Sequence, residues 1–441
     1  MAISHREIES ISSTPLIGSI DEFFSSPLKL YERCAEIDEP IVRTHAFQKP
    51  FFVIQDPLLV EEVLDTKQAS FGRGYLFGMT FGEFAPKSIV ARESDDHWRT
   101  QRLTGQQVFR PQVLDDWIPV FHSVVTDFTE QFDEPQDVAF HEEAQWLIFS
   151  LAVETLFGRS AFPQHSKADL LVAVEKMLDR FRSPVNAVLP SWAPTSTNRR
   201  YREGLETIQS VAEACLLSDD TRSPSLPAHL RSEFDIDDPD VRSRVVDDLI
   251  TYLIAGLDTA GGAVSYGCHL LSEYPEIQER VAAEAALLSD PEEFSIRDIQ
   301  TLEYTQKFIK EVLRIYPPAP HLPRGCTEDV VIGEYAIPEG AAVVLPQWTL
   351  HRSSEYFDDP LTPLPERWDG TPTEFEYAYF PFGGGKRHCM GRRYAITVLS
   401  LIFPLLAANL DFKRALADLE ISATITAYPK HGVPLRLGPS S

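Results

Sequence analysis

The residue best placed for chemistry is Cys389, which lies in the segment FPFGGGKRHCMGRRYA. The three glycines before it, residues 383–385, indicate backbone that approaches a flat group closely or adopts conformations that a Cβ atom would forbid. A helix is expected from about residue 391 to residue 408, so the sulfur lies near a helix N-terminus, where the dipole and the free amides favour a thiolate. The pattern therefore predicts an activated cysteine.

The remaining cysteines are scattered and form no CxxC pair; they are Cys34, Cys215, Cys268 and Cys326. Together with Cys389 they make five. An odd number of separated cysteines is typical of reduced thiols rather than of a disulfide framework or a zinc site. Cys389 is thus distinguished by its neighbours in the chain and not by pairing with another cysteine.

The segment around Cys389 matches a longer pattern, F-x-x-G-x-R-x-C-x-G, position by position. This pattern resembles the haem-binding loop of the cytochrome P450 family. The resemblance implies that the Cys389 thiolate is the proximal ligand of a haem b iron, to which it donates electron density that favours O–O cleavage. It also implies that Arg387 faces a haem propionate, since a guanidinium can pair with a carboxylate through two hydrogen bonds. The other loop residues expected at the cofactor are Phe382, Gly383 and Gly391.

A second candidate site is the segment LIAGLDTAGG, within a long apolar helix expected over about residues 241–273. Its glycines stand where better helix formers are usual, so they need a reason. The segment resembles the oxygen-binding signature A-G-x-D-T of the same family, in which the helix is locally opened over the iron. The resemblance implies that Ala255 and Gly256 lie at the haem. It also implies that the Thr259 hydroxyl holds a water in the pocket and that Asp258 relays protons from solvent.

Three residues outside the cysteine segment resemble the propionate-binding groups of the family. Trp98 and Arg102 are four residues apart on one face of an expected helix and match its W-x-x-x-R. Arg324 follows the double proline at residues 317–318, where the family usually supplies another basic group. The resemblance implies that all three contact the haem.

Glu311 and Arg314 are three residues apart on another expected helix, so their side chains can pair. They resemble the E-x-x-R pair of the family, which binds an arginine in a P-E-R-W-like stretch. The chain contains PERW at residues 365–368, which supplies Arg367. The resemblance implies that these three residues support the haem pocket and are not catalysts.

Substrate contacts in this family come from variable segments, so the resemblance names no substrate. The segment SFGRGYLFGMTFGEFAP is dense in aromatic residues, and Phe77 and Phe81 are expected either to line an apolar access channel or to pack in the core. Ala319 and Leu322 are further candidates for the pocket wall. An apolar channel predicts a fatty acid, a terpenoid or a similar hydrophobic substrate.

The expected fold class is mainly α with smaller β regions (α+β), and the resemblance implies the cytochrome P450 fold. We expect a single domain over residues 1–441, in which haem lies between the oxygen-binding helix and the helix that follows the cysteine. The expected parts are a β-rich margin at about 1–60 and 320–345, a helical body at about 95–315 and the cysteine loop at 382–391.

The chain carries 40 Lys and Arg against 66 Asp and Glu, a formal net charge of -26. This balance argues against nucleic acid or an anionic membrane as a partner, because both select basic surfaces, and it is compatible with life at high salt. The first 20 residues are interrupted by charges and offer neither the apolar core of a signal peptide nor a spanning helix. We therefore expect a cytoplasmic protein with no transmembrane anchor.

The function expected from these features is a monooxygenase that takes O2, a hydrophobic substrate and electrons from a separate ferredoxin- or flavodoxin-type donor. The donor is expected to dock near the basic residues Lys386, Arg392 and Arg393. Three alternatives remain open: a peroxide-using or isomerising haem-thiolate enzyme, a non-catalytic haem-binding or sensor protein, and a haem-free enzyme with Cys389 as nucleophile.

Overall fold

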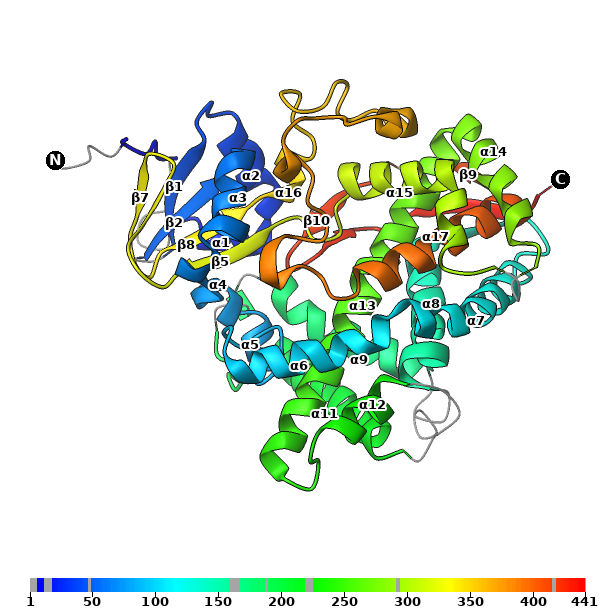
Figure 1. Ribbon diagram of the computed structural model, residues 1–441, viewed down its shortest axis with the longest axis horizontal. Helices are drawn as coiled ribbons and strands as arrows, with labels where there is room; N and C mark the ends of the chain where they lie inside the picture. The colour runs from blue at the N-terminus through cyan, green and yellow to red at the C-terminus, as the bar shows by residue number, and fades with distance from the viewer. Residues whose placement is uncertain are drawn as a thin grey trace.

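The longest helix, α13 (Pro239–Glu273), runs through the middle of the molecule (Figure 1). It begins at Asp238, whose carboxylate accepts hydrogen bonds from two backbone N–H groups of the first turn. Pro239 occupies the first helical position, where its missing N–H costs no hydrogen bond. Farther along, the buried side chains lie on every side of the helix, which is typical of a helix inside a core. The long helix predicted for this segment is therefore confirmed.

The structure is a computed structural model, and it describes residues 6–11, 18–46, 49–158, 167–183, 185–186, 189–218, 225–290, 294–414 and 418–440. Part of the N-terminal segment for which we expected no signal peptide, residues 1–5 and 12–17, lies outside these ranges. Among the described helices, none combines the length and the apolar character needed to cross a membrane.

The chain is mainly helical, and its strands form small sheets, as expected for the α+β class. The other α-helices are α1 (Ile20–Ser25), α2 (Pro27–Ala35), α3 (Pro57–Glu61), α4 (Gly74–Gly78), α5 (Phe81–Phe84), α6 (Asp96–Gln106), α7 (Pro111–Thr129), α8 (Phe140–Ala152), α9 (Lys167–Arg182), α11 (Ser196–Leu217), α12 (Leu226–Glu233), α14 (Pro275–Ala283), α15 (Glu303–Ile315), α16 (Gln347–Leu350) and α17 (Arg392–Asn409). Short helices of other types near the site are η1 (Glu62–Thr66), η8 (Pro365–Asp369) and η10 (Gly385–Arg387). The strands are β1 (Ile41–Ala46), β2 (Lys49–Ile54), β3 (Phe71–Gly72), β4 (Gln136–Ala139), β5 (Leu322–Cys326), β6 (Val330–Ile332), β7 (Tyr335–Ile337), β8 (Ala342–Leu345), β9 (Leu410–Arg414), β10 (Ile421–Ala423), β11 (Ala427–Pro429) and β12 (Pro434–Pro439).

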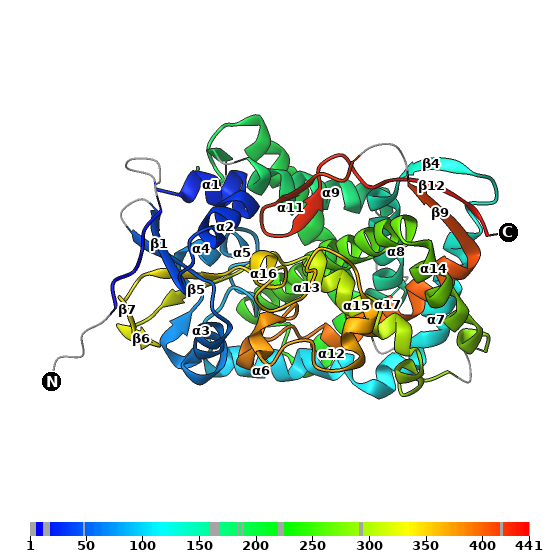
Figure 2. The same cartoon turned by 90° about the horizontal axis from the view of Figure 1, so that it is seen from above.

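Helices α8, α11, α15 and α17 pack against α13 (Figures 1 and 2). The largest hydrophobic cluster joins α13 to α7, α8, α15 and α17 through buried apolar side chains. Phe308 of α15 and Phe403 of α17 meet edge to face there, with ring centroids 5.1 Å apart. This core holds α17, and with it the preceding cysteine segment, at a fixed place beside α13.

The largest sheet, with strand order β1-β2-β8-β5-β3, lies beside the helical part (Figures 1 and 2). Strands β2 and β8 are parallel, and the other neighbours are antiparallel. Alternate residues of β2 face opposite sides: Phe51 and Val53 pack with α1 and α2, whereas Phe52 and Ile54 pack with α3. Both faces of the sheet are buried, which explains the unbroken apolar run in β2.

The β-rich margin is confirmed at residues 320–345, which hold β5 to β8. The first 60 residues differ from the expectation, because α1 and α2 precede β1. Their apolar residues recur at helical spacing, as in Ile20, Phe23 and Phe24, which are all buried against the sheet. Reading this margin as strands and turns alone missed both helices.

Candidate functional site

Cys389 lies in the cysteine loop, residues 382–391, between η10 and α17. Its backbone N–H donates to the Phe382 carbonyl oxygen at 2.8 Å. Gly385 has a φ of 61°, and a Cβ atom there would lie 1.8 Å from the Leu64 carbonyl oxygen of η1. Both the conformation and the space therefore require glycine. The sequence predicted that glycine is required in this loop, and at Gly385 it is. The group that approaches Gly385 closely is the protein backbone at Leu64.

The Cys389 sulfur sits at the N-terminus of α17, as predicted. Desolvation raises the pKa of its thiol, while hydrogen bonds from the backbone N–H groups of Gly391 and Arg392 and the nearby charges of Arg102 and Arg392 oppose that rise. Cys389 is the exposed cysteine, and the other four cysteines are buried. Its sulfur can therefore serve as a ligand. The raised pKa runs against the activated cysteine that the sequence predicts, and a metal cation at the sulfur would favour the thiolate.

Helix α6 places Trp98 and Arg102 beside the cysteine loop. Asp95 caps the helix by accepting a hydrogen bond from the Trp98 backbone N–H at 2.7 Å. The indole Nε1 donates to the Ile89 carbonyl oxygen at 3.0 Å, and the guanidiniums of Arg102 and Arg387 lie 5.5 and 4.9 Å from the ring centroid. Trp98 thus joins α6 to the loop through two arginines.

Four arginines, Arg73, Arg102, Arg324 and Arg387, form what we call the arginine cluster. Desolvation lowers the pKa of Arg73, and the charges of Arg387 and Arg324 lower it further. The pKa of Arg324 falls to about 10, first through desolvation and then through the charge of Arg387. Glu93 is the carboxylate nearest Arg387, at 3.8 Å. Asp95 also acts on Arg387 but is paired with Arg92. These two carboxylates do not balance four partly desolvated cations, so the cluster favours an additional anion.

Unpaired N–H groups in the arginine cluster point to the same conclusion. Nε of Arg73 and Nη1 of Arg387 are buried without a hydrogen-bond partner. The other Arg387 nitrogens donate to the Ser94 hydroxyl and to the Arg92 carbonyl, each at 2.9 Å. Arg102 donates to the His388 carbonyl oxygen at 2.9 Å. The free donors of the cluster match the acceptor oxygens of carboxylates.

Helix α13 brings Ala255, Gly256, Asp258 and Thr259 to the same region. The Thr259 hydroxyl donates to the Ala255 carbonyl oxygen, one turn earlier, at 2.6 Å. A Cβ atom at Gly256 would meet no atom within 4 Å, so this glycine faces open space and does not serve close helix packing. The local opening implied by the resemblance does not interrupt α13, which is continuous from end to end.

Asp258 is buried, with 5% of its surface exposed, and desolvation raises the pKa of its carboxyl. Its oxygens accept hydrogen bonds from the Thr426 hydroxyl and, at 3.5 Å, from Gln145 Nε2. Thr426 belongs to the turn between β10 and β11, and Gln145 belongs to α8. The carboxyl therefore has two donors that hold it in place.

An apolar cavity of about 180 Å³ lies next to Asp258 and Thr259. All four predicted substrate residues line it: Phe77, Phe81, Ala319 and Leu322. The prediction left open whether the two phenylalanines line a channel or pack in the core. Phe77 and Phe81 stack on each other at 5.0 Å and border the cavity, and the access channel stays a prediction.

A family model described as Cytochrome P450 matches residues 10–422. The chain belongs to the cytochrome P450 family. Pentalenene oxygenase of Streptomyces avermitilis is 26% identical, with 96% of each chain covered. Cytochrome P450 3A6 of Oryctolagus cuniculus is 34% identical, over 90% of this chain and 84% of the relative. The structure of retinoic acid bound cyanobacterial CYP120A1 covers 99% of this chain and all of its own, with a TM-score of 0.86 and 22% identity, and confirms the predicted fold.

Membership of this P450 family implies a haem held by a cysteine thiolate and monooxygenase activity. The residues present fit such a group. Cys389 offers an exposed sulfur at a helix N-terminus, the arginine cluster offers unpaired donors for two propionates, and Gly256 leaves space beside α13. These three observations concern different elements of the chain, and each fits a haem.

The pair expected to support the haem pocket of this P450 is fully buried on α15. Arg314 donates to both carboxylate oxygens of Glu311, each at 2.8 Å, and to the His351 carbonyl oxygen at 3.0 Å. Trp368 Nε1 of η8 also donates to Glu311, at 2.9 Å, and Arg367 Nε lies 3.6 Å from it. The structure thus brings the three predicted residues together and adds Trp368.

Sequence reasoning missed two kinds of site residue in this P450. Arg73 joins the arginine cluster, although no motif marked it. The cavity is also lined by residues that the sequence did not indicate. They are Phe23 of α1, Phe181 of α9, His321 just before β5 and Thr426 of the β10–β11 turn. The excess of aromatic and apolar residues was visible in the sequence, but only the fold brings these segments together.

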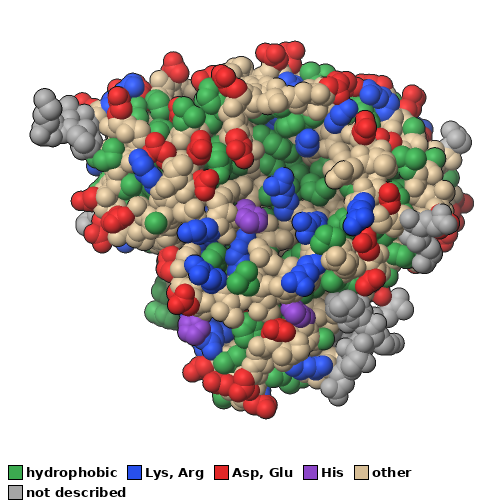
Figure 3. Space-filling view, viewed as in Figure 1, with side chains coloured by type: hydrophobic (Ala, Val, Ile, Leu, Met, Phe, Trp, Pro, Cys, Tyr) green, Lys and Arg blue, Asp and Glu red, His purple; other side chains and the backbone are tan. Residues whose placement is uncertain are grey.

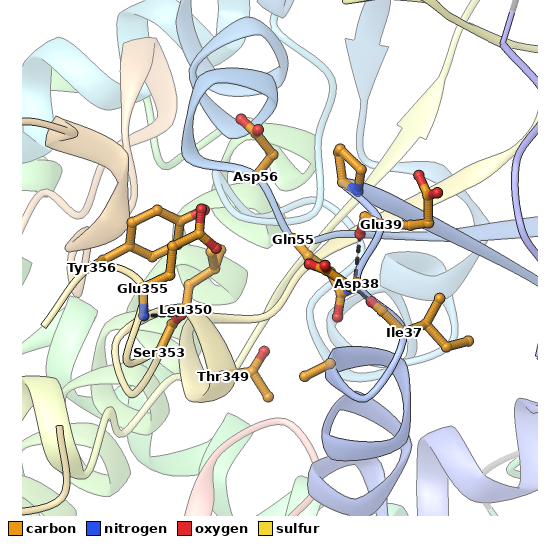
Figure 4. Close-up of a pocket in the computed structure, with 12 residues that line it drawn as sticks. Ile37, Asp38, Glu39, Gln55, Asp56, Thr349, Leu350, Ser353, Glu355 and Tyr356 are labelled. Carbon is orange, nitrogen blue, oxygen red and sulfur yellow. Dashed lines mark hydrogen bonds between the residues drawn. The ribbon is translucent and has the colours of Figure 1, made fainter. Parts of the chain in front are cut away.

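A second recess of about 170 Å³ lies between α2, the start of α3 and the segment after α16 (Figure 4). Acidic side chains border it, and one of them, Glu39, is paired with Arg6 at 2.8 Å. Gln55 closes the adjoining turn by donating to the carbonyl oxygens of Cys34 and Glu39, each at 3.0 Å. The recess shares no lining residue with the apolar cavity, and we assign it no part in the reaction.

Proposed function

We propose that this P450 inserts one oxygen atom from O2 into a terpenoid or similarly hydrophobic substrate, with haem b as cofactor and a separate protein as electron donor. The observation that carries the proposal is the contact between the apolar cavity and the pair Asp258 and Thr259. Two relatives are named pentalenene oxygenase and cyclooctat-9-en-7-ol 5-monooxygenase, which act on terpenoids. Both features support a substrate that is mostly hydrocarbon.

The haem would be held by residues of the cysteine loop, α6, β5 and α13. When bound, the thiolate-ligated haem supplies the activation of O2, which protein side chains cannot perform. Cys389 would bind the iron, and the arginine cluster with Trp98 would hold the propionates. Phe382, Gly383, Gly391, Ala255 and Gly256 would border the faces of the haem, whereas Glu311, Arg314 and Arg367 would fix the loop from behind.

Proton delivery would be the work of Asp258 and Thr259. The raised pKa of Asp258 favours a carboxyl that can carry a proton, and its hydrogen bond with Thr426 keeps it at the edge of the cavity. The Thr259 hydroxyl now donates to the Ala255 carbonyl oxygen, so its oxygen can still accept a hydrogen bond. A water bound to the Thr259 hydroxyl would link the Asp258 carboxyl to the part of the cavity in which the substrate is oxidised. This acid and alcohol favour monooxygenation over peroxide use or isomerisation.

Thr259→Ala tests this route. We expect the variant to bind substrate and to consume reducing equivalents at a similar rate, but to release most of them as hydrogen peroxide, with the yield of product per electron pair lowered about tenfold or more. Thr80→Ala, at another cavity threonine whose hydroxyl donates to the Phe77 carbonyl oxygen, is the matched control and should keep its coupling. Equal coupling in the wild type and Thr259→Ala would remove Thr259 from the mechanism.

The electron donor would bind the face that carries the cysteine loop. Figure 3 shows Lys and Arg side chains gathered around a hollow in the middle of this face, with acidic side chains mostly at its margins. Lys386 of the cysteine loop and Arg392 and Arg393 at the start of α17 are exposed, although Arg393 also donates to the Phe109 carbonyl oxygen at 3.2 Å. An acidic carrier of the ferredoxin or flavodoxin type would be attracted to this patch, which contrasts with a net charge of -26 for the whole chain.

An optical titration of the purified ferric protein with terpenoids, steroids and fatty acids tests the substrate class. A substrate that displaces water from the distal side shifts the spectrum, and turnover of the best ligand under isotopically labelled O2 should place one labelled atom in the product. Product without the label, or a protein that binds no haem, would contradict the proposed function.

A further inference from the structure

His321 is a cavity residue that the proposed reaction does not use. It directly precedes β5, and 6% of its surface is exposed. Its ring packs between Phe23 of α1 and Tyr31 of α2, with centroids 5.1 and 5.5 Å away. Within the described part of the chain neither ring nitrogen has a hydrogen bond, and Nδ1 is completely buried. A buried imidazole without a partner is costly, so it calls for an explanation.

Four other polar side chains around the cavity, those of Thr80, Thr259, Thr426 and Asp258, are occupied by protein partners. The hydroxyls of Thr80 and Thr259 donate to backbone carbonyl oxygens at 3.0 and 2.6 Å. Thr426 donates to Asp258, which is the acidic residue of the wall. Thr424 is half-buried in the β10–β11 turn. His321 therefore stands apart as a buried polar side chain without a protein partner. Because Nδ1 has no accessible surface, Nε2 is the ring nitrogen left for a ligand.

The charge of the cavity wall limits what that ligand can be. Burial lowers the pKa of His321 to about 3, so its imidazole is neutral near pH 7 and offers one N–H donor and one acceptor nitrogen. None of the described residues that line the cavity is Lys or Arg. A carboxylate in this cavity would lose its hydration without gaining a cation and would face Asp258. A hydroxyl or carbonyl oxygen carries no such cost.

We propose that His321 is a specificity-determining residue that binds a hydroxyl or carbonyl group of the substrate, which is a neutral, already oxygenated hydrophobic molecule. This inference rests on the proposed function and narrows its substrate class from hydrocarbons and acids to alcohols and ketones. Because His321 packs against α1 and α2 whereas Thr259 lies on α13, the bound oxygen and the carbon to be oxidised would be at different parts of the cavity. The enzyme would then add a second oxygen function to a singly oxygenated molecule.

Three ligands that share one carbon skeleton test the proposal: farnesol, farnesene and farnesoic acid. Their dissociation constants are measured on the ferric holoenzyme by optical titration. We expect the wild type to bind farnesol about tenfold more tightly than farnesene, since one neutral hydrogen bond to a buried group has about this effect, and to bind farnesoic acid least tightly. In His321→Leu the farnesol preference should fall to about one, mainly through weaker farnesol binding.

Two further variants separate hydrogen bonding from shape. His321→Gln keeps a donor and an acceptor and should retain part of the preference for farnesol. Tyr31→Phe removes the unpartnered hydroxyl beside His321 without changing the cavity wall, and it should keep the full preference. A wild type that binds farnesol no more tightly than farnesene, or a His321→Leu variant with an unchanged ratio, would overturn the proposal. Either result, obtained with an intact thiolate spectrum and oxygen insertion into any hydrophobic ligand, would leave the proposed function standing.

Discussion

The cysteine loop and the apolar cavity serve one reaction, yet the chain builds them in different ways. The loop is a single run of ten residues whose shape is fixed by local features, such as the positive φ of Gly385 and the hydrogen bond from Cys389 N–H to Phe382. The cavity wall is assembled from six separate parts of the chain, each of which supplies a few side chains. A cofactor ligand can therefore be positioned by one short segment of the chain. A substrate pocket built from many segments can be altered by changing one side chain at a time.

The two regions also differ in what their polar groups do. Around the loop, the arginine cluster and the Glu311–Arg314 pair are strongly charged, and Arg314 and Arg387 also donate to backbone carbonyl oxygens. Around the cavity, Asp258 is the acidic residue among the described lining residues, desolvation raises the pKa of its carboxyl, and His321 is neutral. The first environment suits a fixed dianionic cofactor, and the second suits a neutral substrate.

The largest effect is expected at the loop itself, from Cys389→Ala. Removing the sulfur leaves the protein without an iron ligand in this loop, so we expect the thiolate spectrum and the monooxygenase activity to be lost completely. Reduced protein with carbon monoxide gives the spectroscopic measurement. Cys215→Ala, at a buried cysteine of α11, is the control and should keep both properties. A thiolate spectrum that persists in Cys389→Ala would contradict the assignment of the site.

The buried pair behind the loop gives the next largest effect. Glu311→Gln replaces an oxygen that accepts hydrogen bonds by a donor, and the fully buried Arg314 loses its counter-charge. We expect the free energy of unfolding to fall by about 3–5 kcal/mol, as is usual when one partner of a buried ion pair is removed. Urea denaturation followed by circular dichroism measures it. The exposed pair of Glu39 with Arg6 is the comparison, and Glu39→Gln should cost less than about 1 kcal/mol.

The same contrast explains which features of the molecule could be predicted from the sequence. Cys389, the α13 segment around Thr259 and the E-x-x-R pair were found because residues a few positions apart must act together, so their spacing is visible in the chain. Arg73 and His321 could not be found in this way. Each is a single residue whose role depends on neighbours far away in the sequence, such as Arg387 for the former and Phe23 for the latter. The α1 and α2 helices were missed because they are short and their apolar residues resemble those of a sheet margin.

Replacing Arg73 tests the charge of the arginine cluster through two measurements that should change in opposite directions. They are the stability of the haem-free protein and the affinity for haem. In Arg73→Leu a partly buried cation with an unpaired Nε is replaced by an apolar side chain, so the haem-free protein should become more stable. The affinity for haem should fall about tenfold, because a charge-assisted hydrogen bond to a propionate is lost. Haem transfer to an acceptor protein measures the affinity, and denaturation of the haem-free protein measures the stability. Arg99→Leu, at an exposed arginine of α6, should change neither, and a loss of both in Arg73→Leu would show a purely structural role.

The smallest effect concerns Asp248, which ties α13 to the segment before α6, between the two regions. Its carboxyl accepts hydrogen bonds from Ile89 N–H and Gln101 Nε2, each at 2.7 Å, and its pKa is raised to about 7, chiefly by desolvation. The folded protein therefore keeps a proton that the unfolded chain loses above about pH 4. The contribution of Asp248 to stability is consequently greatest at low pH and falls as the pH rises towards 7, where the folded state must bury the charge.

Asp248→Asn removes this charge but keeps a carbonyl oxygen for Ile89, and its amide can donate to the unpaired Gln101 Oε1 once the glutamine amide is turned. We expect the variant to be more stable than the wild type at pH 8, by at least about 1 kcal/mol, and to lose this advantage towards pH 4. Thermal unfolding across this pH range measures the difference, and Asp116→Asn, at an exposed position of α7, should show none. A constant difference at all pH values would mean that the Asp248 side chain acts through packing and not through its charge. In that case the contact of α13 with Ile89 and Gln101 would depend on the shape of the side chains, as the cavity wall does. It would not depend on charge, as the arginine cluster does.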